Sequence, residues 1–167
     1  VGRITVFQDP ILAKAPPEWA LKNKTTGELW ADRKKLHWMD PAAKPVWDYN
    51  VAIARDALAR GFDEINLDYI RFASDGDLNV IEYPIWGGKT HRHAAIREFF
   101  EYFRVNLPAA RISADLFGLA TVNPDDLGIG QVIEDAYENF DYVSPMIYPS
   151  HYAKGFLGYA NPAEHPY

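Results

Sequence analysis

The sequence predicts an α/β fold with a parallel sheet, and three of its features lead to this prediction. Four strand-like segments alternate with three amphipathic segments of helical spacing. This alternation is typical of right-handed βαβ units, which build parallel sheets. Each strand also carries one apolar and one polar face. A polar second face favours a sheet closed into a barrel, because an open sheet with helices on both sides needs two apolar faces.

The predicted strands are short segments in which apolar, β-branched and aromatic residues predominate. In chain order they span residues 3–9, 64–72, 111–118 and 142–150. Side chains alternate between the two faces of a strand. Asn66 and Asp68 therefore share the polar face of the second strand, and Ser113 and Asp115 share that of the third.

The predicted helices are segments whose apolar residues recur every three or four positions. They lie within residues 47–58, 96–107 and 129–140. Gly61 and Pro108 follow the first two segments, at positions where such residues commonly end helices. Two long connections, residues 10–44 and 73–90, each follow the carboxyl end of a predicted strand. Parallel α/β folds place their chemistry at this end.

The chain length sets how much of a barrel can be present. The 167 residues fit one domain, residues 1–167. A complete (β/α)8 barrel of the TIM type needs roughly 250 residues and eight strands. The chain is then either a single partial barrel of about four βα units or a smaller four-stranded α/β domain, and we favour the partial barrel. Its open sheet edges would be a liability, and whether such a fragment is active by itself stays open.

Composition argues against several classes of function. The net charge of −6 disfavours binding to nucleic acid. No apolar run approaches the roughly 20 residues of a membrane span. The absence of cysteine excludes disulfides and thiolate metal sites. No glycine-rich loop has the spacing of a nucleotide site, and we expect no cofactor. The first residues read as a strand and not as a signal peptide.

Asp68 and Asp115 are the predicted catalytic residues. Glycosidases typically use two carboxyl groups that flank the scissile bond. Adjacent parallel strands lie about 4.8 Å apart, which fits the separation of roughly 5–5.5 Å in retaining enzymes. We assign Asp68 as the nucleophile and Asp115 as the acid/base. The structural alternative is that one aspartate only forms an ion pair with Arg71.

Six further residues are predicted to contact a sugar, each with a structural alternative. Arg71 could bind an acid group of the substrate or form a structural ion pair. Asp9 could bind substrate or fix a turn. Tyr148, at the end of the fourth strand, could donate a hydrogen bond to a sugar hydroxyl or to Asp115. His151 could be an acid/base or part of a loop. Loop tryptophans such as Trp86 could stack on sugars, although packing is their more frequent use. The full set is Asp9, Asn66, Arg71, Trp86, Tyr148 and His151.

Several motifs resemble a family of bacterial glycosyl-hydrolase-like domains with a TIM-barrel fold. The stretches are VFQDPILA from Val6, WDYN from Trp47, GFDEINLDYIRF from Gly61, SADLFG from Ser113 and SPMIYPSHY from Ser144. The resemblance spans nearly the whole chain. It implies that the strands are the third to sixth of eight and, more loosely, that the substrate is a sugar. Gln8 and Ala73 stand where the family pattern has Lys and Pro.

The sequence therefore predicts a glycoside hydrolase that acts on a polysaccharide, with an extracellular or cell-envelope location. Two alternatives remain open at this point. A non-catalytic carbohydrate-binding barrel would keep the aromatic residues but tolerate loss of either aspartate. A metal-dependent hydrolase would use Asp68, Asp115 and His151 as ligands, although no metal-binding motif is present and we expect no metal. The expected partner is a carbohydrate, and the oligomeric state stays open.

Overall fold

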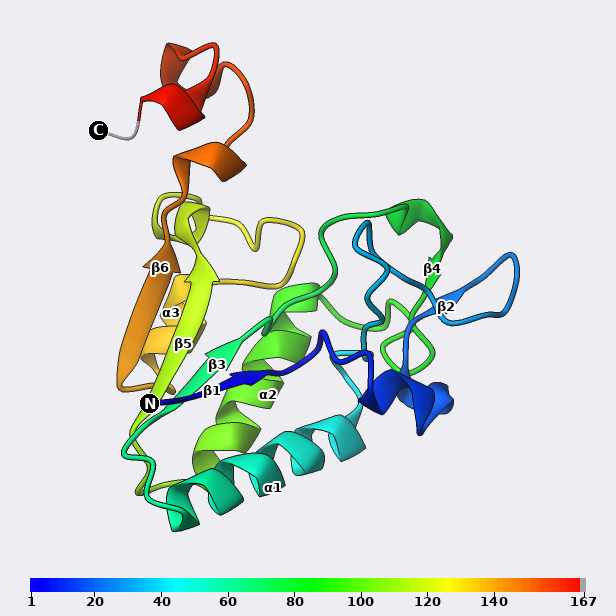
Figure 1. Ribbon diagram of the computed structural model, residues 1–167, viewed down its shortest axis with the longest axis vertical. Coiled ribbons are helices and arrows are strands. Elements are labelled where there is room, and N and C mark those ends of the chain that lie inside the picture. Colours follow the sequence, from blue (N-terminus) through cyan, green and yellow to red (C-terminus); the bar gives the residue numbers. More distant parts are fainter. Residues whose placement is uncertain (166–167) are drawn as a thin grey trace.

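The computed structural model describes residues 1–165, apart from the side chain of His151. A four-stranded parallel sheet is its centre (Figure 1). The strands lie in chain order, β1-β3-β5-β6. Their bounds are Gly2–Thr5, Ile65–Asp68, Ile112–Phe117 and Tyr142–Met146. The predicted parallel α/β architecture is confirmed.

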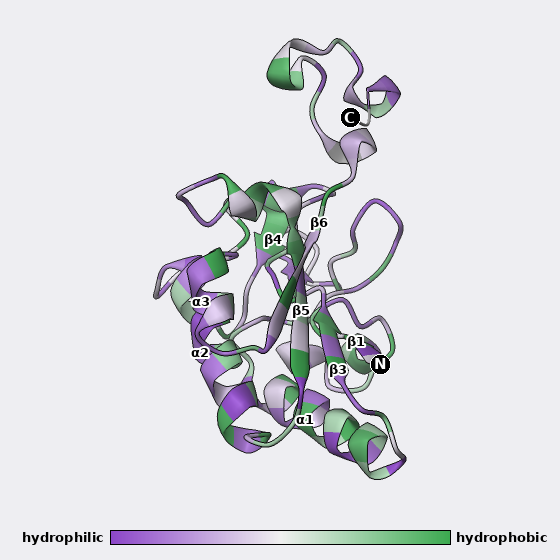
Figure 2. Ribbon diagram, turned by 90° about the vertical axis from the view of Figure 1, so that its left-hand side faces the viewer, coloured by the Kyte–Doolittle hydropathy of each residue, from purple (hydrophilic) through white to green (hydrophobic). Residues whose placement is uncertain are grey.

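Three helices cover one face of this sheet. They are α1 (Lys44–Ala59), α2 (Arg92–Asn106) and α3 (Ile133–Tyr137). Figures 1 and 2 show them grouped on the same side of the strands. Strands in chain order with right-handed crossovers require this arrangement, because each connection returns over the same face. The third helix is shorter than the segment 129–140 that the apolar pattern predicted. Gly130 adopts a φ of +85°, which lies outside the range of an α-helix, so the helix begins after it.

The hydrophobic core fills the space between the sheet and the helices. Ile65, Leu67, Ile112 and Ala114 point from the two central strands into it and are fully buried. Helix α2 contributes a row of phenylalanines at helical spacing, and Phe99 contacts rings on several sides. The apolar face of the strands thus has the packing role that the sequence predicted.

The other face of the sheet is polar and carries no helix. Thr5 of β1 and Ser144 of β6 are exposed on it, and the side chain of Arg3 is 56% exposed. Polar positions recur on alternate residues of the strands in Figure 2. Any chemistry on this face is therefore reachable from solvent in the described chain.

Two short strands that were not predicted from the sequence lie in the two long connections and link them to each other. β2 (Lys22–Asn23) and β4 (Ile81–Glu82) form an antiparallel pair. The Nε1 atom of Trp30 donates to the carbonyl of Asp77, 3.0 Å away, which adds a further link. Two-residue strands give almost no periodic signal, which explains why sequence patterning missed them. The connections form one layer beside the carboxyl ends of β1 and β3.

Three predicted strands are too long, each at its carboxyl end. β1 ends at Thr5 and not at residue 9, β3 ends at Asp68 and not at residue 72, and β6 ends at Met146 and not at residue 150. At β3 the cause is Tyr69, whose φ of +55° breaks the extended backbone. After β6 the chain enters the 3-10 turn Pro149–His151 and projects from the body (Figures 1 and 2). None of the helices in the described residues is long and apolar enough to traverse a membrane.

Candidate active site

Asp68 and Asp115 lie side by side on the open polar face. Leu67 of β3 pairs with Ala114 of β5, which places the next residue of each strand at the same height. A single guanidinium contacts both carboxylates. Arg3 Nη2 donates to Asp68 Oδ2, and Arg3 Nε lies 3.9 Å from Asp115 Oδ2. Both carboxylates therefore point away from the helices and toward the same cation.

The two carboxylates differ in their surroundings. The side chain of Asp68 is 6% exposed, whereas that of Asp115 is 18% exposed. Asp68 Oδ1 accepts a hydrogen bond from the backbone N–H of Tyr69 at 2.6 Å, so both Asp68 oxygens have donors. Asp115 Oδ1 accepts only from a neutral amide, Asn66 Nδ2, at 3.0 Å. Asp68 thus has the closer contact with the cation.

The electrostatics raise the pKa of the Asp115 carboxyl above its ordinary value. Burial is the largest cause, because it disfavours the charged form, and the negative charge of Asp68 acts in the same direction. The hydrogen bond from Asn66 and the charge of Arg3 lower the pKa, but they do not outweigh burial. Asp115 therefore holds its proton to higher pH than an exposed aspartate does.

A chain of hydrogen bonds supports Asp115 from below. Asn66 Nδ2 also donates to Ser113 Oγ at 3.1 Å, and Ser113 Oγ donates to Glu64 Oε1 at 2.6 Å. Ser113 is buried on the same face, two residues before Asp115. The chain fixes the orientation of the Asn66 amide, because its nitrogen must face both acceptors. Asn66 therefore positions the Asp115 carboxylate, in addition to its predicted role as a substrate contact.

Tyr69 turns the chain sharply at the end of β3. It adopts a φ of +55°, a left-handed conformation that costs a non-glycine residue about 1 kcal/mol or more. Its ring packs edge-on against Trp38, with centroids 5.8 Å apart. Strained residues of this kind persist where the surroundings enforce them and cluster at functional sites. Here the turn brings the Tyr69 N–H onto Asp68.

Arg71 lies close to this site but is not the ion-pair partner of either aspartate. Its guanidinium is surrounded by three rings, with that of Phe117 nearest at 4.7 Å. The alternative that Asp68 or Asp115 forms an ion pair with Arg71 is wrong, because Arg3 takes that place.

Two of the other predicted contacts, Asp9 and Trp86, lie in structural surroundings. Asp9 Oδ1 accepts from the N–H groups of Ile11 and Leu12, at 3.0 and 2.8 Å, and fixes a turn. The Trp86 ring packs against Phe72, with centroids 5.0 Å apart. Tyr148 is 49% exposed, two residues beyond β6. His151 belongs to the 3-10 turn after β6, and its side chain lies outside the described part of the chain.

Arg3 and Glu64 belong to the site although they were not among the predicted residues. Arg3 contacts both carboxylates, and Glu64 ends the hydrogen-bond chain below Asp115. The signal for Arg3 was present: it lies two residues before Thr5 and so shares the polar face of β1. The signal for Glu64 was present too: it begins the predicted strand 64–72 and so shares the face of Asn66 and Asp68, although in the structure it immediately precedes β3.

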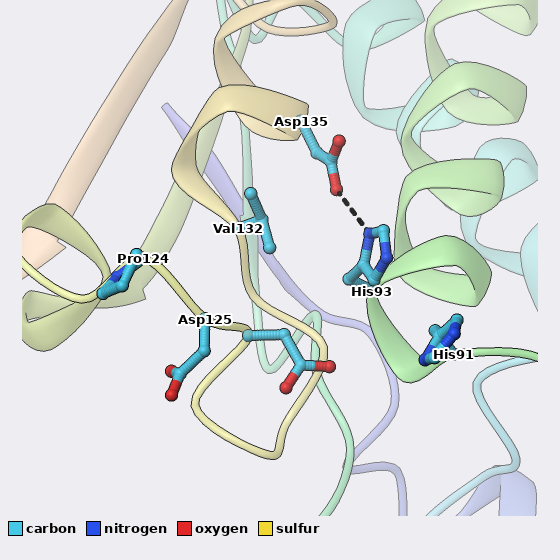
Figure 3. Close-up of a pocket in the computed structure, with 7 residues that line it drawn as sticks. His91, His93, Pro124, Asp125, Val132 and Asp135 are labelled. Carbon is cyan, nitrogen blue, oxygen red and sulfur yellow. Dashed lines mark ion pairs between the residues drawn. The ribbon is translucent and has the colours of Figure 1, made fainter.

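A separate surface pocket lies between the amino-terminal ends of α2 and α3 (Figure 3). It has a cavity volume of about 440 Å³, and His91, His93 and Asp135 are among its lining residues. His93 Nδ1 lies 3.6 Å from Asp135 Oδ2. Among the side chains that the structure describes, which exclude that of His151, no group of three or more histidine, aspartate or glutamate residues is placed to hold a metal ion. This pocket lies among the helices and not on the open polar face.

The fold and the site together define an α/β protein with a parallel sheet and a pair of carboxylates at neighbouring strand ends. The family model described as "Putative glycosyl hydrolase domain" matches residues 1–167. The chain belongs to this family. A search of curated proteins finds no significant match.

Comparison with solved structures finds chains similar to this one. A hypothetical protein from Ruminiclostridium thermocellum ATCC 27405 is 37% identical, with a TM-score of 0.61 over 77% of this chain. This chain spans 58% of the length of that protein's chain. An α-galactosidase from Thermus thermophilus, solved in complex with stachyose, is 19% identical with a TM-score of 0.46, and the match covers 67% of this chain and 23% of that one.

Proposed function

We propose that this protein is a glycoside hydrolase that cleaves a polysaccharide with Asp68 and Asp115. The family match supports a glycosidase-like function. One observation supports the site: two neighbouring carboxylates share a cation but lie in different surroundings, and burial raises the pKa of the Asp115 carboxyl. Acid/base enzymes commonly assign their roles through such a difference between two titratable groups.

The roles follow from the surroundings. Asp68, paired with Arg3, is the nucleophile that attacks the anomeric carbon. Asp115, with its raised pKa, protonates the glycosidic oxygen as that bond breaks. The now ionised Asp115 then takes a proton from water. The oxygen of that water replaces Asp68 at the anomeric carbon, which releases the sugar and regenerates both carboxyl groups.

The open polar face supports a further proposal about the fold. Strands in chain order, with helices on one face and polar groups on the other, are what part of a (β/α)8 barrel would present. We propose that the strands correspond to the third to sixth of such a barrel. Asn66, Arg71, Tyr148, His151, Asp9 and Trp86 stay proposed substrate contacts. A polysaccharide substrate fits an extracellular or cell-envelope location.

A carbohydrate-binding domain without catalysis is the second candidate. The contact of Arg3 with Asp68 favours it, because an ion pair of this kind also occurs as a purely structural element. In that case Asp68 would only orient Arg3 toward a bound sugar. The two candidates differ in whether a glycosidic bond is broken.

The deciding experiment is an assay of the whole protein and its Asp68→Asn and Asp115→Asn variants on a panel of bacterial polysaccharides. We expect the Asp115 variant to lose roughly 10²–10⁴-fold in rate and the Asp68 variant to lose at least as much. Sugar binding and the thermal midpoint should stay close to wild type. Asp63→Asn is the matched control, because Asp63 is exposed and precedes the opposite end of β3.

Each other outcome points elsewhere. Binding without cleavage by the wild-type protein would support the binding domain. Loss of wild-type cleavage on addition of a chelator would support a metal-dependent hydrolase. Unchanged cleavage in both aspartate variants would overturn the assignment of the site.

A further inference from the structure

Arg71 is a buried cation at the edge of the candidate active site. It is 8% exposed, and among residues 1–165 it is the only buried lysine or arginine. It follows β3 by three residues. Its guanidinium lies 4.7 Å from the Phe117 ring, 4.9 Å from Trp38 and 5.5 Å from Tyr69. These rings come from the end of β5, from the first long connection and from the end of β3.

This placement connects Arg71 to both carboxylates. Phe117 lies two residues beyond Asp115 on the same face of β5, and Tyr69 directly follows Asp68. The charge of Asp68 acts on Arg71 through space. Arg71 therefore lies above the carboxylate pair, toward the carboxyl ends of the strands.

No carboxylate neutralises this cation within the described residues. Arg71 Nη1 donates to the carbonyl of Phe72 at 3.1 Å and to Ser74 Oγ at 2.8 Å, and both acceptors are neutral. The four arginines that do form ion pairs within 4.0 Å are Arg3, Arg60, Arg97 and Arg104. Burial lowers the pKa of Arg71. A buried charge without a partner is costly, so it is usually completed by an opposite charge.

The nearest acidic residues are unsuited to that role. Asp32 and Asp75 attract Arg71 only through space. Asp32 already accepts hydrogen bonds from Gln8 and Trp38, at 2.8 and 3.0 Å, and from two backbone N–H groups. Within the described residues, the Nε and Nη2 atoms of Arg71 donate to no carboxylate, which leaves that side of the guanidinium fork for a ligand.

We propose that Arg71 binds the carboxylate of an acidic sugar, so that the substrate class of this site is a uronate-containing glycan. A guanidinium fork matches a carboxylate with two parallel hydrogen bonds, and the surrounding rings offer flat surfaces to a sugar. Arg3 and Arg71 balance Asp68 and Asp115 in charge, so the site accepts an anion although the chain carries −6 overall. This inference rests on the proposed glycosidase function, which it narrows to one substrate class.

The test is a binding titration of the whole protein that does not need turnover. The probes are two matched pairs, D-glucuronate with D-glucose and D-galacturonate with D-galactose. Binding is followed by NMR, including the arginine Nε–H resonances. We expect at least one uronate to bind roughly 10-fold or more tightly than its neutral partner. Arg71→Met should abolish that preference, and Arg71→Lys should weaken it because the fork is lost.

Lys44→Met is the matched control. Lys44 Nζ also lies over a ring, 5.7 Å from that of Trp47, but it belongs to α1 on the helix-covered side of the sheet, outside the site. This variant should keep the uronate preference. If Arg71→Met fails to fold, judged by its thermal midpoint, Arg71→Lys decides the matter. An unchanged preference in Arg71→Lys would then overturn the proposal.

Two further results separate this inference from the proposed function. Equal binding of uronates and neutral sugars, or no binding of either uronate, would overturn the acidic subsite even if a neutral polysaccharide is cleaved. A uronate preference that depends on Arg71, in a protein that cleaves no glycan, would support the subsite and overturn the glycosidase proposal.

Discussion

Replacing Asn66 with leucine tests how the protein sets the pKa of Asp115. The Asn66 amide donates to Asp115 Oδ1 at 3.0 Å and thereby lowers the pKa of that carboxyl. Leucine has a similar volume but no donor. A hydrogen bond to a charged group contributes roughly 1.5–3 kcal/mol. We therefore expect the Asn66→Leu variant to lose about that much stabilisation of the ionised Asp115, so that the pKa of this carboxyl rises.

The sign of the effect on activity follows from the proposed role of Asp115. A general acid must be protonated, so activity is lost as pH rises through its pKa. The basic limb of the pH–rate profile should thus move to higher pH in Asn66→Leu. The free energy of unfolding should depend on pH as well. The stability that a carboxyl group with a raised pKa contributes is present at low pH and is lost as pH rises through that pKa.

The measurement is a titration of the aspartate carboxyl ¹³C resonances, which requires no substrate, together with the pH–rate profile. Asn50→Leu is the matched control, because Asn50 is also buried but belongs to α1 on the opposite side of the sheet. An Asp115 pKa that stays constant or falls in Asn66→Leu would refute the account of the site given above.

Three other changes have defined expectations. Phe99→Ala should lower the free energy of unfolding by roughly 3–5 kcal/mol, measured by urea denaturation, since Phe99 is fully buried among rings. Tyr69→Gly should relieve backbone strain of about 1 kcal/mol yet lower the catalytic rate, because it frees the turn beside Asp68; equal rates would contradict that link. Asp40→Ala should lower the free energy of unfolding by about 1–3 kcal/mol, again measured by urea denaturation, because it leaves the N–H groups of Ile85 and Trp86 without their acceptor.

The strand alternation predicted the polar face that carries the candidate site, because burial of the other face leaves little freedom. Ile65 and Leu67 must enter the core, so Asn66 and Asp68 must take the opposite face. The same reasoning placed Asp115. The neighbouring order of the strands followed from the βαβ pattern. These features depend on local periodicity, which can be read from the sequence, and on the handedness of the crossover, which is the same in nearly all βαβ units.

The parts that sequence reasoning missed depend on contacts between distant segments. Arg3 meets Asp68 across two strands, 65 positions apart, and no local pattern states which cation a carboxylate will meet. The left-handed Tyr69 is enforced by its surroundings and not by its residue type. Trp86 lies on the Phe72 and Tyr83 rings, and residue type alone could not separate this packing from a sugar platform.

The antiparallel pair β2–β4 makes the two long connections mechanically dependent on each other. Asp40 of the first connection holds the N–H groups of Ile85 and Trp86 in the second, at 2.8 and 3.0 Å. A lid movement by either segment alone would have to break these bonds. The segments should therefore exchange their amide hydrogens as one cooperative unit. A change of length in one connection would accordingly need a compensating change in the other.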